Sequence, residues 1–129
     1  MIEYKIVEKV VRNGRGSLGL RYVAQLVSAG RMASSETVAA VSRETLLPEA
    51  AVESVLAALE RVMERGLTEG RVVEVPHVGV FRCGIEGRSA STREEAERGV
   101  ARLRVNYLPS PLLRKEVHWD KARRAGPEG

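Results

Sequence analysis

A long helix with a wide apolar stripe is the feature of this sequence that most constrains its fold. Pro48 and Glu49 mark its start, because proline fits a first helical turn and a carboxylate suits the positive end of the helix dipole. Gly66 and Gly70 mark its end. The apolar positions recur at helical spacing and are Val52, Val55, Leu56, Leu59, Val62 and Met63. The opposite face mixes glutamates with arginines, which favours core or dimer packing over a membrane-surface helix or a mimic of a partner peptide.

The chain has few large side chains from which to build a core. Its 129 residues fit one compact domain, and aromatic residues make up only 4% of them although 43% are apolar. The core must therefore consist of Val, Leu, Ala and Met. A core this thin often needs a partner subunit.

The remaining elements follow from alternation, glycine and proline. Residues 3–11 and 20–28 are expected to be strands joined by the glycine-rich turn at 13–17, which lacks the GK[ST] ending and following helix of a phosphate-binding P-loop. A helix capped by Ser34 or Ser35 runs to about residue 44. Strands are expected at 71–75, 78–86 and 100–108, with a bend at Pro76-His77. Short helices are expected at 92–98 and 111–117, and disorder from about residue 121.

The basic residues are unevenly distributed. Residues 1–78 carry ten Lys/Arg and ten Asp/Glu, whereas residues 79–129 carry eleven against seven, which accounts for the whole net charge of +4. This asymmetry points to a polyanionic partner for the second half of the chain, and ordinary solubilising charge is the alternative.

Strand parity separates the arginines from the apolar residues in that half. In 100–108, Ala101, Leu103, Val105 and Tyr107 share one face, while Arg102, Arg104 and Asn106 share the other. Phe81, Cys83 and Ile85 are likewise separated from Arg82 and Arg88. Guanidinium groups bind phosphate through paired hydrogen bonds and stay charged at physiological pH. The pattern predicts a basic ribbon with an apolar underside, and the alternative is that these arginines only solvate an exposed sheet face.

Catalytic and targeting signals are weak. His77 and His118 have no metal-ligand spacing, Cys83 lies in an apolar strand pattern typical of an inert thiol, and Glu94, Glu95 and Glu97 have the pattern of a solvated face. A lone cysteine excludes an intrachain disulfide and agrees with a reducing cytoplasm. The first ten residues alternate charged and apolar, unlike a signal peptide, and no run reaches the length of a membrane span. We therefore expect a cytoplasmic protein that is not an enzyme and has no cofactor, metal, membrane or small-molecule partner.

Several strings, in this order, resemble the HU/IHF family of histone-like DNA-binding proteins, and more closely its HU-like branch with an extra N-terminal β-hairpin. IEYKIVEKV and RYVAQLVSAGRMASSETVAAVS resemble that branch's hairpin and first helix. LLPEAAVESVLAALERVMERGLTEGRVVEVPHVGVFR is similar to the second helix and the turn into the sheet, with Val78-Gly79-Val80-Phe81 at a glycine–x–phenylalanine signature. VNYLPSPLLRKEV resembles the segment leading to the last helix.

The resemblance implies an α+β fold in a homodimer, with helices at the dimer base and an antiparallel β-sheet saddle from which β-arms reach around double-stranded DNA. It implies one HU-like domain over 1–118, with a hairpin extension at 1–30 and a core at 31–118, followed by a basic tail at 119–129. The DNA-facing residues it implies are Arg82, Arg88, Arg102 and Arg104 on the arm, and Arg114 and Lys115 on the last helix.

This chain departs from the family pattern at two places. Its arm tip, residues 87–99, is shortened, partly acidic and lacks the proline that wedges between base pairs, so strong DNA bending is not implied. Ser110-Pro111 stands where the family usually has glycine and lysine. The expected function is sequence-independent DNA binding by a nucleoid-associated architectural protein. The alternative is an HU-fold protein-interaction module that has lost its grip on DNA.

Overall fold

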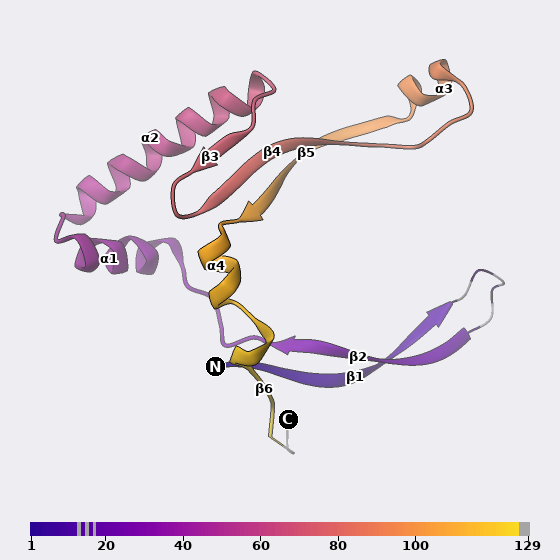
Figure 1. Cartoon of the computed structure of the whole chain (residues 1–129), viewed down its shortest axis with the longest axis horizontal. Coiled ribbons are helices and arrows are strands. Elements are labelled where there is room, and N and C mark those ends of the chain that lie inside the picture. Colours follow the sequence, from indigo (N-terminus) through magenta and orange to yellow (C-terminus); the bar gives the residue numbers. More distant parts are fainter. Residues whose placement is uncertain (13, 15, 17, 127–129) are drawn as a thin grey trace. The chain divides into compact units, whose positions relative to one another are not determined.

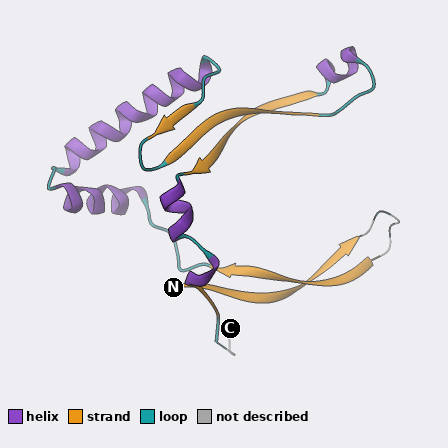
Figure 2. Cartoon of the chain, in the orientation of Figure 1, coloured by secondary structure: helices purple, strands orange, loops and turns teal. Residues whose placement is uncertain are grey.

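The computed structural model describes residues 1–12, 14, 16 and 18–126 of the chain. They form two compact units: a terminal unit, made of residues 1–32 and those from 116 onward, and a central unit of residues 33–115. Figure 1 traces both along the sequence, and Figure 2 separates their helices from their strands. The fold is mixed α+β, as expected, with four α-helices and two three-stranded sheets in the described part of the chain.

The terminal unit is built on a long antiparallel hairpin. Strand β1 (Ile2–Arg12) pairs with β2 (Leu18–Val27) in a register that runs from Glu3 opposite Val27 to Arg12 opposite Leu18. This confirms the two strands expected from alternation. The expected turn between them falls largely on Asn13, Arg15 and Ser17, which lie outside the described residues.

The C-terminal segment completes this sheet, so disorder from about residue 121 is wrong for the part described. A 3₁₀ helix, η1 (Trp119–Lys121), precedes β6 (Ala122–Arg124), which pairs in parallel with the start of β1. The rings of Trp119 and Tyr4 lie 4.8 Å apart, and the Arg123 guanidinium donates two hydrogen bonds to Glu3. These contacts order a segment whose composition alone resembles a solvated tail.

Two helices open the central unit. Helix α1 (Ser34–Thr45) has Ala33 as its N-cap with no side-chain cap, so the expected cap at Ser34 or Ser35 is wrong. The hydroxyl of Thr37 donates to the Ala33 carbonyl instead. Helix α2 (Glu49–Thr68) begins directly after Pro48, as expected, and contacts α1 and the sheet.

The central sheet is antiparallel in the order β3-β4-β5. Its strands are β3 (Val73–Val75), β4 (Gly79–Gly87) and β5 (Val100–Pro109). The short helix α3 (Arg93–Arg98) lies between β4 and β5, and the Thr92 side chain caps it by accepting a hydrogen bond from the backbone N–H of Glu95. Helix α4 (Pro111–Glu116) follows β5. These elements agree with those expected from the sequence.

The turn between β3 and β4 uses two residues in the left-handed region, His77 (φ 67°) and Gly79 (φ 148°). Gly79 cannot be replaced without strain, because a Cβ atom there would lie 2.2 Å from the Leu108 carbonyl oxygen. The hydroxyls of Tyr107 and Ser110 donate to the carbonyls of Val78 and His77, respectively. His77 is therefore a turn residue, as expected, and this turn is fastened to the end of β5.

The central unit buries little apolar surface by itself. Among the described residues the buried apolar side chains are Val38, Val52 and Val75. Beside this small core lies an open groove of about 860 Å³ between α2 and the underside of β4 and β5. Apolar side chains dominate its walls, and they include Leu56, Leu59, Met63, Leu67, Phe81, Ile85, Leu103 and Val105. The wide stripe of α2 is thus left partly uncovered within one chain.

Within the described ranges, no helix combines the length and the apolar character that crossing a membrane requires.

Candidate nucleic-acid interface

Strands β4 and β5 form a ribbon with one apolar and one polar face. Opposite residues share a face in an antiparallel pair, and the register sets Arg82 opposite Asn106, Gly84 opposite Arg104 and Glu86 opposite Arg102. The other face carries Phe81 and Val105, and it borders the groove beside α2. The structure therefore confirms the predicted separation, with Arg82, Arg102 and Arg104 on one face. We call this the arginine face.

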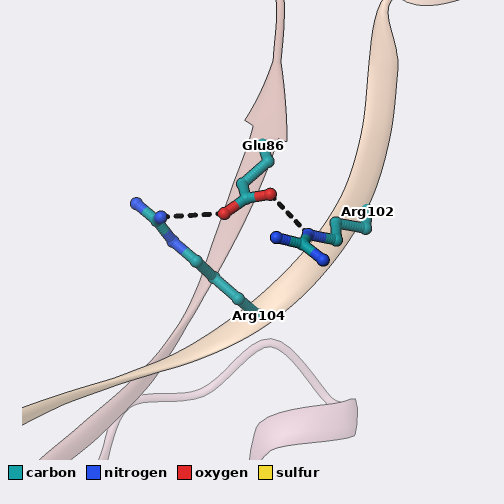
Figure 3. Close-up of polar contacts among 3 residues, drawn as sticks. All are labelled: Glu86, Arg102 and Arg104. Carbon is teal, nitrogen blue, oxygen red and sulfur yellow. Dashed lines mark hydrogen bonds and ion pairs between the residues drawn. The ribbon is translucent and has the colours of Figure 1, made fainter.

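A carboxylate lies among the arginines. Glu86 accepts a hydrogen bond from Arg102 Nε at 2.5 Å through one oxygen and from Arg104 Nη1 at 3.0 Å through the other (Figure 3). The two guanidinium side chains remain 72% and 55% exposed, whereas the Glu86 side chain is only 30% exposed. Phosphate in solution thus has access to both arginines, but it must compete with a carboxylate that already binds them.

Gly84 leaves space on the arginine face between Glu86 and Asn106. It sits opposite Arg104, and a Cβ atom at this position would lie 2.5 Å from Asn106 Nδ2 and 3.4 Å from Arg104 Nε. Without a side chain on β4 at this row, Arg104 lies across the ribbon toward Glu86. A β-bulge at Glu86 and Gly87 then ends the regular register beyond Arg102.

The ion pairs change the acidity of Glu86. The hydrogen bond from Arg102 lowers the pKa of Glu86 below its ordinary value, and the charge and hydrogen bond of Arg104 act in the same direction, against the opposing effect of desolvation. Glu86 is therefore ionised throughout the physiological pH range. The arginine face carries one fixed negative charge among three positive ones.

The other predicted DNA contacts lie apart from this cluster. Arg88 follows the end of β4, where its backbone N–H donates to the Gly99 carbonyl. Arg114 and Lys115 are in the last turn of α4. The Arg114 guanidinium donates to the Pro109 carbonyl at 3.2 Å, so it helps to fix the junction between β5 and α4.

Candidates for other chemistry are few. Among the residues described, no group of three or more His, Cys, Asp and Glu side chains is placed to hold a metal ion. Cys83 borders the groove beside α2, and its thiol donates to the Leu67 carbonyl at 3.5 Å. This thiol is exposed in the single chain, so its expected place in a core is not reached within one subunit.

The sequence did not indicate that Glu86 binds both arginines. The signal that was missing is the register, because only the pairing of β4 with β5 sets Glu86 opposite Arg102 and one row from Arg104.

Comparison with known proteins identifies the family. The chain matches the family described as "HU-HIG: HU domain fused to wHTH, Ig, or Glycine-rich motif" over residues 1–124. The chain belongs to the HU-HIG family. Membership in a family built on the HU domain supports DNA binding in general.

A solved structure shares the fold. It comes from Bacteroides vulgatus ATCC 8482 and is provisionally described as a bacterial DNA-binding protein, with a TM-score of 0.66 and 10% sequence identity to this chain. The match covers 95% of this chain but only 47% of the other, so this HU-HIG chain spans about half the length of that protein. No curated protein matches the sequence.

Proposed function

We propose that this HU-HIG protein binds duplex DNA, with little dependence on base sequence, through the arginine face of β4 and β5. The observation that carries the proposal is that Arg82, Arg102 and Arg104 share one exposed face of a two-stranded ribbon. A ribbon of this kind fits along a DNA groove, and guanidinium groups bind backbone phosphates without reading base sequence. The family and the fold of the Bacteroides protein support DNA as the partner.

We further propose that the DNA-binding form is a homodimer. The groove beside α2 leaves large apolar side chains exposed, including Leu56 at 41%, Leu103 at 67% and Val105 at 59%. A second copy that covers this groove would supply the core that one chain lacks, because burial of apolar area is the main favourable term in folding and association. In such a dimer Cys83 would also be covered.

The proposed site includes three further cations. Arg88 supplies a cation just beyond the end of β4, and Arg114 and Lys115 supply contacts to flanking phosphates from α4. The role proposed for the protein is that of a nucleoid-associated architectural protein in the bacterial cytoplasm, with no catalytic activity.

A second candidate function is a protein-interaction module that has kept the HU fold. The observation that favours it is Glu86, which partly neutralises the arginine face by binding both Arg102 and Arg104. If these ion pairs hold the arginines firmly, phosphate gains little by displacing the carboxylate. Retention on a DNA resin at physiological salt separates the two functions, because an interaction module would flow through.

The test of the proposed function is a salt series of anisotropy measurements with a labelled random-sequence duplex of 30 base pairs. The double variant Arg102→Ala/Arg104→Ala should bind about 10- to 50-fold more weakly at ~0.1 M salt, and its plot of log affinity against log salt should be shallower by about 1 to 2. Arg61→Ala on the exposed side of α2 is the matched control for charge. An affinity equal to that of the control would contradict the proposal.

A further inference from the structure

We infer that the β1–β2 hairpin of the terminal unit carries a second, separate binding surface for the phosphate backbone of duplex DNA, formed by Lys5, Lys9 and Arg21. The register sets Lys5 opposite Gln25 and Lys9 opposite Arg21. Residues separated by two along a strand share a face, so all three cations lie on the same side of the hairpin. We call this side the lysine face.

The lysine face has no available carboxylate. Glu3 lies on it, but the Arg123 guanidinium binds Glu3 at 2.8 and 3.2 Å. Glu8 lies on the opposite face and accepts a hydrogen bond from the Tyr22 hydroxyl at 3.0 Å. Within the part of the chain that the structure describes, no carboxylate is within ion-pair distance of Lys5, Lys9 or Arg21.

Lys9 and Arg21 form an unfavourable pair as the hairpin stands. Like charges placed directly opposite in an antiparallel ladder destabilise it, because their Cβ atoms lie only about 5 Å apart. An anion that lies over this row would remove the repulsion and would gain two contacts at once. A bound polyanion therefore offsets an electrostatic cost that the free hairpin pays.

The spacing of the cations suits an extended polyanion. Lys5 and Lys9 are four residues apart on β1, which separates their rows by about 14 Å. Each strand of duplex DNA presents a phosphate every 3.4 Å along the helix axis, so a short stretch of backbone reaches both rows. A small isolated anion would reach only one of them.

The distribution of apolar residues argues against a membrane as the partner. The most exposed apolar side chains of the hairpin, such as Leu20 at 62% and Tyr22 at 67%, lie on the face opposite the three cations. The exposed apolar side chains of the lysine face are the smaller and less exposed Val11 and Val23, at 43% and 37%. Insertion of Leu20 and Tyr22 into a lipid surface would point the lysine face away from the anionic headgroups, whereas membrane-binding elements place cations at the border of the inserted face. The lysine face is better matched to a polyanion that needs no apolar insertion.

A charge reversal gives the sharpest test, because binding and stability should change in opposite directions. Lys9→Glu in the full chain should raise the melting temperature, since a glutamate opposite Arg21 converts repulsion into a cross-strand ion pair. The same variant should bind the 30-base-pair random duplex more than tenfold more weakly at ~0.1 M salt, with a salt slope shallower by about 1 to 2. Arg12→Gln, on the opposite face of the same hairpin, is the control.

Three results would overturn the inference. The first is a duplex affinity of Lys9→Glu within twofold of that of Arg12→Gln. The double variant Lys9→Gln/Arg21→Gln repeats this comparison without introducing a negative charge. The second is a Lys9→Glu variant that no longer binds phosphatidylglycerol vesicles, which the wild type binds, while its affinity for DNA is unchanged. This result would identify a membrane partner. The third is a wild-type chain that binds no duplex. The Arg102→Ala/Arg104→Ala variant keeps the two surfaces distinguishable, because it should leave the contribution of the lysine face intact.

Discussion

The chain contains two antiparallel hairpins, β1–β2 and β4–β5, that are alike in pattern and different in electrostatics. On each hairpin three cations share one face, and the larger apolar side chains lie mainly on the other. On β4–β5, Glu86 lies opposite Arg102 and forms ion pairs with both Arg102 and Arg104. On β1–β2, Lys9 lies opposite Arg21, so two like charges face each other. Arg102 and Arg104 on β4–β5 thus have an ion-pair partner before any ligand binds, whereas Lys9 and Arg21 on β1–β2 have none among the described residues. Net charge alone therefore does not predict which cations are available to a ligand.

The apolar faces differ as well. The apolar face of β4–β5 borders the groove beside α2. On the apolar face of β1–β2, Trp119 packs near Tyr4, and Leu20 and Tyr22 are left exposed farther along the hairpin. We therefore expect the apolar face of β4–β5, and not that of β1–β2, to form the interface of the proposed dimer.

Leu103→Asp should dissociate the proposed dimer, because it places an unpaired carboxylate in the groove that the second copy is proposed to cover, at a cost of about 3 kcal/mol or more. Leu20→Asp should leave the dimer intact, although Leu20 and Leu103 are similarly exposed in the single chain, at 62% and 67%. Light scattering and sedimentation measure both. Dissociation by Leu20→Asp would instead place the β1–β2 hairpin in the interface.

A smaller effect should follow from removing the charge of Glu86. Glu86→Gln frees both guanidinium groups and removes a negative charge near the bound phosphates, so duplex affinity should rise about three- to tenfold with a steeper salt slope. Glu8→Gln on the other hairpin should change the affinity less than twofold, because Glu8 lies on the face opposite the cations. Anisotropy titrations at ~0.1 M salt measure both variants. Unchanged affinity in Glu86→Gln would mean that the arginine face does not contact DNA.

The smallest effect is on the pH dependence of stability. The pKa of Glu86 is lowered in the folded chain, so its ion pairs stabilise the fold above the ordinary carboxyl pKa, and this contribution is lost as pH falls through the lowered value. The melting temperature of wild type should thus exceed that of Glu86→Gln by a constant small amount from pH 7 to 5, and the difference should vanish in more acidic solution. It is small because both arginines are exposed. A difference that grows on acidification would contradict this assignment.

The sequence predicted the elements better than the contacts between them. Alternation in residues 100–108 was sufficient to place Arg102 and Arg104 on one face, because side-chain direction in a strand depends on parity alone. The cap of α1 was misplaced at Ser34 or Ser35, since the preference of serine for N-caps does not reveal a helix that begins one residue earlier, after Ala33, with no side-chain cap. The order in residues 119–124 was missed because it depends on Tyr4 and Glu3, more than 100 residues away.

The cross-strand charge pairs of the two hairpins could not be predicted from the sequence, also because they depend on contacts between distant residues. Whether Glu86 meets Arg102, or Lys9 meets Arg21, depends on strand register, which the intervening loops and the bulge at Gly87 determine. The distribution of net charge in the sequence points only to the basic residues from position 79 onward. The cations of β1 were overlooked because acidic residues elsewhere in the first 78 positions balance them.

The pairing of β6 with β1 makes the central unit an insertion within the terminal sheet. Ile2 pairs with Ala122, so the whole of residues 33–115 lies inside the loop that this pairing closes. Closing a flexible loop costs less entropy when the loop is shorter, by about 0.6 kcal/mol for each halving of its length. Folding of the central unit removes most of this loop's freedom and thereby favours docking of β6. The two units are thus coupled in folding through chain connectivity, and this coupling requires no contact between them.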